Sequence, residues 1–192
     1  LVFFLSDNGG TKVSGAYSNG PLRGWKGSVF EGGVRVPMAA WWPGRIEPGT
    51  IYGYPVHAMD IVATAVHLAG GKLPQDRAYD SRDLAPVLLE GRRDRLHDEP
   101  MFWSSLGMQA VRLEDWKLVM RGNRIEGLYN MAADPGEEHN RAGEFPERVQ
   151  ALRQRYDRWT EECPKPVFRP VGRKRFKEWE KKQGTIDDEW KK

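Results

Sequence analysis

The first 37 residues hold the side chains whose types and spacing could do chemistry. An apolar run over residues 1–5 leads into Asp7 and Asn8, and Gly9 and Gly10 follow directly. A carboxylate next to an amide carbonyl offers two hard oxygen donors, the kind that Ca²⁺ or Mg²⁺ prefers. The two glycines allow a sharp turn and a close approach of the backbone to a ligand. Asp-Asn-Gly is also a common turn sequence, so a metal site needs support from elsewhere in the chain.

The apolar run itself predicts where these donors lie. Residues 1–5 show no alternation of apolar and polar side chains, which is typical of a strand buried on both faces of a parallel sheet. In open α/β sheets, ligands bind just beyond the carboxyl ends of the strands. We therefore expect an α/β domain with a mostly parallel sheet, and Asp7 and Asn8 at its ligand-binding edge.

A second group of charged residues follows within the same stretch. Arg23 and Lys26 lie among glycines, and Glu31 precedes a second double glycine that leads to Arg35. A lysine between glycines can reach an anionic group as a compact point charge. Glu31 and Arg35 are spaced as candidates for an ion pair.

Taken together, the two blocks resemble the sulfatase family of the alkaline-phosphatase superfamily. The late active-site segment of that family reads S-D-N-G-G, a loop, and then P-L-R-x-x-K-x-x-x-x-E-G-G-x-R-x-P. Every fixed position is present here in the same order, and two blocks are more specific than one. The resemblance implies that Asp7 and Asn8 are ligands of a Ca²⁺ ion and that Lys26 contacts sulfate oxygens. It assigns a structural role to three further residues: Arg23, Glu31 and Arg35.

The resemblance also implies a reaction and an incomplete site. Family members hydrolyse sulfate monoesters with a formylglycine nucleophile, made from a Cys or Ser in a C/S-x-P-x-R motif, and with Ca²⁺ as Lewis acid. This sequence contains no such motif. We therefore expect the chain to be the carboxyl-terminal part of a longer sulfuric ester hydrolase. Alone it would be inactive, bind Ca²⁺ weakly and tend to aggregate.

Two alternatives remain open from the sequence. Phosphonate and phosphodiester hydrolases of the same superfamily, and choline-sulfatase-like members, usually carry His where this chain has Asn8, so Asn8 favours the arylsulfatase type. A non-catalytic pseudo-sulfatase could instead bind sulfated polymers through Lys26 and the basic tail after Cys163. A C/S-x-P-x-R motif upstream would distinguish the enzyme from the binding protein.

Composition narrows the class of protein further. The chain has 192 residues, a net charge of +3 and a pI near 9.0, which suits an anionic substrate. Because Lys and Arg are spread along the chain, the charge does not indicate nucleic-acid binding. The single cysteine, Cys163, excludes an internal disulfide. No apolar run reaches the ~20 residues of a membrane span. The family resemblance implies a sulfated small molecule or carbohydrate as substrate, and a periplasmic, secreted or lysosomal location.

The remaining pattern predicts the supporting elements. We expect a second buried strand over 34–42 and a buried helix over 61–69 with Asp60 as its N-cap. His57 and His67 are interpreted as structural. Short strands at 101–104, 109–112, 116–120 and 127–130 predict a small antiparallel sheet with a covering helix over 146–161. Glu137, Glu138 and His139 are interpreted as a solvated turn and not as a metal cluster.

These elements suggest three parts. Residues 1–95 would form the end of an alkaline-phosphatase-like α/β catalytic domain, in which the strands belong to a sandwich. Residues 96–162 would form a small α+β subdomain, and residues 163–192 a charged tail with ten basic and five acidic residues.

Overall fold

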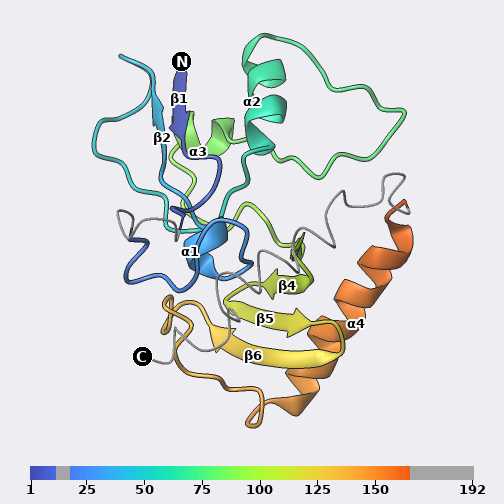
Figure 1. The fold of residues 1–192 in the computed structure, drawn as a ribbon. Helices are drawn as coiled ribbons and strands as arrows, with labels where there is room; N and C mark the ends of the chain where they lie inside the picture. The colour runs from blue at the N-terminus through green and yellow to red at the C-terminus, as the bar shows by residue number, and fades with distance from the viewer. Residues whose placement is uncertain (12–17, 165–192) are drawn as a thin grey trace. The chain divides into compact units, whose positions relative to one another are not determined.

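The computed structural model describes residues 1–11 and 18–164 (Figure 1). It divides into two compact units, Leu1–Arg158 and Trp159–Lys192. The basic tail and the polar loop after Thr11 lie outside the described residues. The elements, in chain order, are β1 Val2–Leu5, α1 Glu31–Val34, β2 Met38–Trp41, α2 Asp60–Leu68, α3 Ala85–Leu89, β3 Met101–Ser105, β4 Met108–Leu113, β5 Trp116–Arg121, β6 Arg124–Asn130 and α4 Pro146–Glu162.

The strand pairing at the amino end corrects one expectation. β1 pairs antiparallel with β2, with Phe3 opposite Ala40, and every strand pair among the described residues is antiparallel. The predicted mostly parallel sheet is therefore wrong for this structure. The side chains of Phe4 and Trp41 are 70% and 65% exposed, so the run is not buried on both faces. An apolar run predicts that a strand needs burial, but it does not specify the direction of the strand beside it.

The second sheet matches its prediction. It contains four antiparallel strands in the order β3-β4-β5-β6. The turns between them use left-handed backbone at Glu114 and Gly122, with φ of 53° and 57°. Glycine adopts this conformation without steric cost, whereas Glu114 does so at the tip of a two-residue hairpin connection.

Each face of this small sheet packs on a different part of the chain. On one face, Val29 and Phe30 join a core cluster that includes Ala110, Val119 and Tyr129. On the other, α4 contributes the buried side chains of Leu152 and Tyr156, and the Tyr156 ring lies 6.2 Å from that of Phe102. The predicted covering helix is confirmed, and α4 lies beside the four-stranded sheet (Figure 1). The segment just before α1 therefore belongs to the core of the small sheet.

α2 differs from its prediction in two respects. Asp60 is the first residue of the helix and caps no helical N–H. Its fully buried carboxylate instead accepts hydrogen bonds from the backbone N–H of His57 and Arg82 and from Nε2 of His97, at 2.7, 2.8 and 2.8 Å. The helix is also not buried all round, because Val62 is 57% exposed. Asp60 thus joins three segments that are distant in the sequence.

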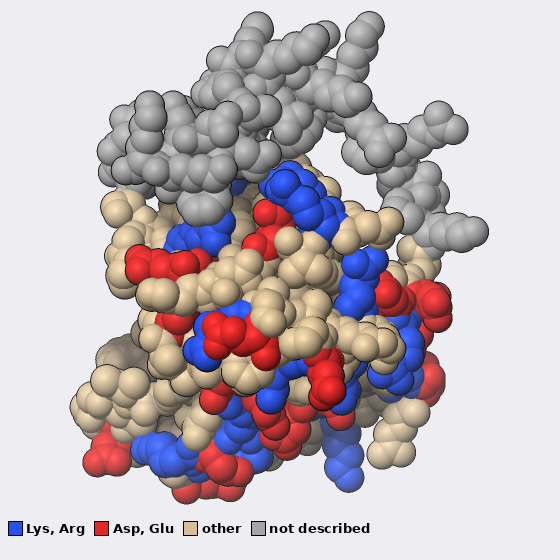
Figure 2. Space-filling view, turned by 90° about the horizontal axis from the view of Figure 1, so that it is seen from below, with Lys and Arg blue, Asp and Glu red and all other residues tan. Residues whose placement is uncertain are grey.

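One face of the molecule carries charges of both signs. On the face shown in Figure 2, Lys and Arg side chains are interspersed with Asp and Glu. Charges of opposite sign therefore offset one another locally on this face and create no extended field of one sign there.

In the part of the chain that the structure describes, no helix combines the length and the apolar character that crossing a bilayer requires.

The Asp60 carboxylate makes stability depend on pH. Burial by itself would raise the pKa of Asp60, but the hydrogen bonds from His97, Arg82 and His57 outweigh it and lower this pKa below its ordinary 3.8. A lowered folded-state pKa stabilises the fold at pH values above 3.8, and this stabilisation is lost as the pH falls through the folded value. Asp60→Asn should therefore unfold about 1–3 kcal/mol more easily at pH 6.

Urea unfolding between pH 3 and pH 7 measures this effect. The difference between Asp60→Asn and the unmodified chain should shrink as the pH falls below 3.8. A difference that stays constant over this range would contradict the assigned role of the carboxylate.

Candidate functional site

The turn after β1 rests on α1 and on the start of β2. The Ser6 N–H donates to the Pro37 carbonyl and the Gly9 N–H to the Gly33 carbonyl, both at 3.2 Å. The Ser6 hydroxyl donates to the backbone carbonyl of Asn8 at 2.8 Å. The backbone that carries Asp7 and Asn8 is therefore fixed on both sides of these residues.

A second set of hydrogen bonds joins this turn to the segment that carries Lys26. The Lys26 N–H donates to the Gly10 carbonyl at 3.0 Å. The Asn19 side chain accepts from the Gly10 N–H at 2.8 Å and donates to the carbonyls of Gly10 and Gly24 at 3.2 and 3.1 Å. The two blocks recognised in the sequence thus meet in space. Asn19, which the sequence did not identify as a site residue, joins them through these hydrogen bonds.

The approach of the two blocks to α1 leaves no space for side chains at two glycines. A Cβ at Gly9 would lie 1.7 Å from the Gly32 carbonyl oxygen, and one at Gly32 would lie 2.4 Å from that of Gly24. The Gly32 N–H also donates to the Arg23 carbonyl at 2.6 Å. The double-glycine motifs therefore allow three stretches of backbone to touch, which is a requirement for space and not for a special φ angle.

The side chains of the three candidate site residues are at least partly exposed. Asp7 and Lys26 are both exposed and Asn8 is half-buried. Among the described residues, the carboxylate of Asp7 and the ammonium group of Lys26 make no hydrogen bond or ion pair. An anionic oxygen donor and a cation are thus held on adjacent fixed loops, where both are available to a ligand.

Asp7 and Asn8 offer the oxygen atoms that a hard cation prefers, but they offer fewer than such a cation needs. Asp7 supplies a carboxylate and Asn8 an amide oxygen, whereas Ca²⁺ takes roughly 6–8 oxygen ligands. Within residues 1–11 and 18–164, no group of three or more His, Cys, Asp or Glu side chains could hold a metal ion. The described residues fit part of a calcium site.

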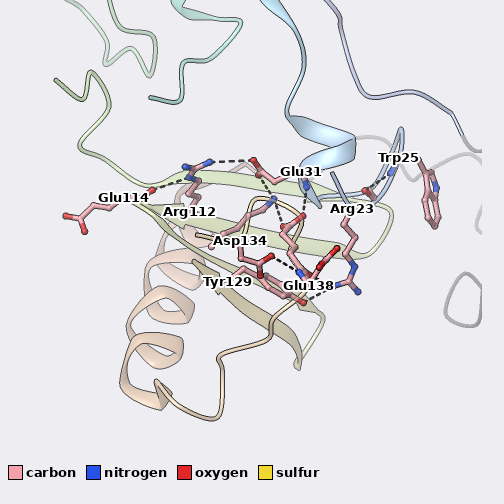
Figure 3. Close-up of polar contacts among 11 residues, drawn as sticks. Arg23, Trp25, Glu31, Arg112, Glu114, Tyr129, Asp134 and Glu138 are labelled. Atoms are coloured by element: carbon pink, nitrogen blue, oxygen red, sulfur yellow. Dashed lines mark hydrogen bonds and ion pairs between the residues drawn. The ribbon is translucent and has the colours of Figure 1, made fainter. Parts of the chain in front are cut away.

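Beneath this site, Glu31 at the start of α1 lies in a buried ionic cluster (Figure 3). Its Oε1 accepts a hydrogen bond from Lys117 Nζ at 2.8 Å, and its Oε2 lies 3.6 Å from Arg112. The predicted Glu31–Arg35 ion pair is wrong, because the exposed Arg35 contacts Glu31 only through its backbone N–H. The helical turn directs the Glu31 side chain inward to the sheet and leaves Arg35 on the surface.

Glu137 completes this cluster, which corrects the prediction of a solvated turn. Its side chain is fully buried, and Oε1 lies 2.9 Å from Lys117 Nζ as an ion pair while Oε2 accepts the Glu31 N–H at 2.6 Å. Burial raises the pKa of Glu137, although Lys117 and the Glu31 N–H act in the opposite direction. Glu138 and His139 remain exposed.

The loop that delivers Glu137 is held by two polar side chains. The Asp134 carboxylate accepts the N–H groups of Glu138 and His139 at 3.0 and 2.9 Å. The Asn140 side chain accepts the Leu128 N–H at 3.1 Å. These bonds stabilise a turn in which Glu137 has a φ of 57°. Asp134 and Asn140 therefore hold the loop so that one glutamate, Glu137, enters the core.

Arg23 adds a further contact between the site segment and the small sheet (Figure 3). One guanidinium nitrogen donates to the Tyr129 hydroxyl at 2.9 Å and to the Glu137 carbonyl at 3.1 Å. The guanidinium also lies 3.9 Å from the centre of the Phe30 ring. Burial raises the pKa of Tyr129, while the charge of Arg23 opposes the rise. The structural role expected for Arg23 and Glu31 agrees with these contacts.

Sequence reasoning missed Lys117 and Glu137. One signal was available for Lys117. In the predicted strand it shares a face with Val119, so alternation places a charge on the apolar face of the sheet. Such a lysine needs a buried carboxylate partner. For Glu137 no local pattern separates it from its exposed neighbours.

The fold and this site define a class before any comparison is made. An oxygen-donor turn after a strand and a lysine on an adjacent glycine-rich loop are joined by a short helix that is anchored in an antiparallel sheet. This arrangement fits the acceptance of a dinegative or mononegative oxyanion beside a hard cation. It therefore indicates a site for an oxyanion of the sulfate or phosphate type.

Comparison with known proteins narrows the class. Residues 1–71 match the family model described as Sulfatase. The chain is 40% identical to steryl-sulfatase of Mus musculus over 131 residues, which is 63% of this chain and 20% of that protein. It is 37% identical to an arylsulfatase of Hemicentrotus pulcherrimus over 127 residues, 65% of this chain and 23% of that protein.

A solved structure is similar to this chain in fold as well as in sequence. The crystal structure of Ps i-CgsB in complex with k-i-k-neocarrahexaose superposes with a TM-score of 0.77 and 30% identity, covering 86% of this chain and 37% of that one. The chain thus contains a segment of the sulfatase family, at residues 1–71. It spans about a fifth of the length of the curated relatives it matches.

The glycine contacts give a direct test of the site geometry. Gly9→Ala should destabilise the chain by about 3 kcal/mol, because the new methyl group overlaps the Gly32 carbonyl and the backbone must move. Gly53→Ala is the matched control, since nothing lies within 4 Å of a Cβ there. It should change the free energy of unfolding by less than about 1 kcal/mol. Equal effects of the two substitutions in urea unfolding would refute the close packing described above.

Proposed function

We propose that this chain forms part of a sulfuric ester hydrolase, in which Asp7 and Asn8 bind Ca²⁺ and Lys26 contacts the sulfate group. The observation that carries the proposal is the hydrogen bond from the Lys26 N–H to the Gly10 carbonyl, at 3.0 Å. This bond joins the cation-binding turn to the anion-binding lysine, as a sulfate monoester between Ca²⁺ and a lysine would require. The match of residues 1–71 to the sulfatase family model supports the same reaction.

Each residue then has a separate role. The Asp7 carboxylate and the Asn8 amide oxygen would hold the metal, and the ammonium group of Lys26 would offset negative charge on the sulfuryl oxygens. When bound, Ca²⁺ supplies Lewis acidity and orients the sulfate. The remaining metal ligands and the formylglycine would come from residues outside this sequence.

The proposed substrate class is a sulfated carbohydrate or a small aryl or alkyl sulfate. The bound oligosaccharide in the related solved structure supports a carbohydrate, and the name of the steryl-sulfatase relative supports a small alcohol ester. The division into parts at residues 95 and 162, and the periplasmic, secreted or lysosomal location, stay predictions. Asn8 continues to favour the sulfatase over a phosphoester or phosphonate hydrolase.

A chimera tests the role of Lys26. In the Hemicentrotus pulcherrimus arylsulfatase, the matching segment is replaced by the corresponding residues of this chain, and turnover of p-nitrophenyl sulfate is measured. Because a preorganised charge acts mainly in the transition state, Lys26→Ala should lower kcat about 10²–10³-fold. Lys72→Ala, which removes an exposed lysine elsewhere, should leave kcat unchanged. A normal kcat in Lys26→Ala would show that the lysine is structural.

The same chimera tests the calcium ligands by a readout other than activity. Added Ca²⁺ should raise the melting temperature of the chimera, and Asp7→Ala should abolish this rise together with turnover. Asp98→Ala, at another exposed aspartate, is the control and should keep both. The 192-residue chain alone should bind Ca²⁺ only weakly, because it offers about two of the roughly 6–8 donors needed. A Ca²⁺-dependent shift that persists in Asp7→Ala would exclude this residue as a ligand.

A further inference from the structure

The buried cluster of Glu31, Lys117 and Glu137 brings together three segments that are far apart in the sequence. Lys117 Nζ lies between Glu31 Oε1 at 2.8 Å and Glu137 Oε1 at 2.9 Å, and the three side chains are at most 3% exposed. Arg112 contributes a second positive charge at 3.6 Å from Glu31. Because buried charges are costly when any partner moves away, such a cluster tolerates few arrangements of its segments.

This cluster holds the first turn of α1 by both side chain and backbone. The Glu31 carboxylate binds Lys117, while the Glu31 N–H donates to Glu137 Oε2 at 2.6 Å. A single ionic contact would allow α1 to rotate about it. Two contacts at different atoms of one residue fix the position and the direction of the short helix.

α1 in turn touches both loops of the proposed site. The Gly33 carbonyl accepts the Gly9 N–H, and the Gly32 N–H donates to the Arg23 carbonyl. The absence of space for a Cβ at Gly9 and Gly32 shows that these contacts are made backbone to backbone. Any displacement of α1 must therefore move the turn that carries Asp7 or the loop that carries Lys26.

The small sheet also contacts the Lys26 loop directly. The hydroxyl of Ser105, at the end of β3, donates to the Gly27 carbonyl at 2.8 Å. The side chain of Leu106 packs against Gly27. The residue next to Lys26 is thus fixed by β3, independently of the buried cluster.

We propose that Lys117, Glu137 and Ser105 are positioning residues that set the relative placement of Asp7, Asn8 and Lys26. They touch neither metal nor substrate, and they act through α1 and Gly27. The consequence for catalysis rests on the proposed function. The mechanical coupling between the small sheet and the site loops does not rest on the proposed function. An experiment can therefore refute the coupling and the proposed function separately.

Amide hydrogen exchange followed by NMR in the 192-residue chain, without Ca²⁺ or substrate, tests the coupling. Glu137→Gln keeps an oxygen acceptor for the Glu31 N–H but removes the charge that pairs with Lys117. The amides of Gly9, Lys26 and Gly32 should then exchange about tenfold faster, as expected for local opening after the loss of one strong interaction. The amides of Leu118 and Val119 in β5 should change much less.

Asp60→Asn is the matched control, because it alters another fully buried carboxylate whose hydrogen-bond donors, on His57, Arg82 and His97, lie outside α1. It should lower global stability without preferentially accelerating exchange at Gly9 and Lys26. Ser105→Ala is the milder variant and should fold even if Glu137→Gln does not. It should accelerate exchange at Lys26 about threefold to tenfold, the range expected for one lost hydrogen bond.

The outcomes separate clearly. Faster exchange at the site loops in Glu137→Gln or Ser105→Ala, but not in Asp60→Asn, supports the positioning role. Uniform acceleration throughout the chain in every variant would overturn it, because the cluster would then be a general stabilising contact. A chimera in which Lys26→Ala stays active would refute the proposed function and leave the exchange result intact.

Discussion

Lys117 lies between two carboxylates, and the placement of α1 against the small sheet depends on this contact. The lysine comes from β5, Glu31 from α1 and Glu137 from the loop after β6, so their contact joins the amino-terminal motif to the carboxyl-terminal sheet. None of the three could remain buried and charged without the others, since a lone buried ion loses more hydration free energy than its surroundings return. The apolar contacts of Phe30 with the sheet add to this join, but they do not fix α1 in direction as the ionic contacts do.

The glycines around α1 allow the site loops to pack directly against this helix. Gly9 and Gly32 permit direct backbone contact between the two loops and the helix. Backbone contact is stiff, because a carbonyl has no rotamers through which it can yield. These contacts are the route by which, in our proposal, the buried cluster sets the placement of Asp7 and Lys26. Their own side chains remain exposed and available to ligands.

The apolar surface of the amino-terminal elements contrasts with this tight packing. Phe4, Trp41 and Val62 are largely exposed although they lie in regular elements. The polar site and the buried cluster are well ordered by contacts within the chain, while these apolar side chains find few partners there. Exposed apolar residues on a strand that has one neighbour make this sheet edge the part of the fold most open to association.

The sequence by itself identified the candidate residues of the site and predicted much of the local structure. Asp7, Asn8 and Lys26 were identified from residue types, spacing and family resemblance. The four-stranded sheet and α4 followed from turn residues and from the stripe of Leu152 and Tyr156. These features depend on contacts close in the sequence, which periodicity reports well. The roles of Asp7, Asn8 and Lys26 remain proposals.

Only the tertiary structure decided which distant residues meet. The partner of Glu31 is Lys117 and not Arg35, Glu137 is buried while Glu138 is exposed, and β1 runs antiparallel to β2. A local pattern specifies that a strand needs an apolar neighbour or that a charge needs a counter-charge. It does not specify which segment supplies them, because that choice depends on the path of the whole chain and on the free energy of burying all the groups together.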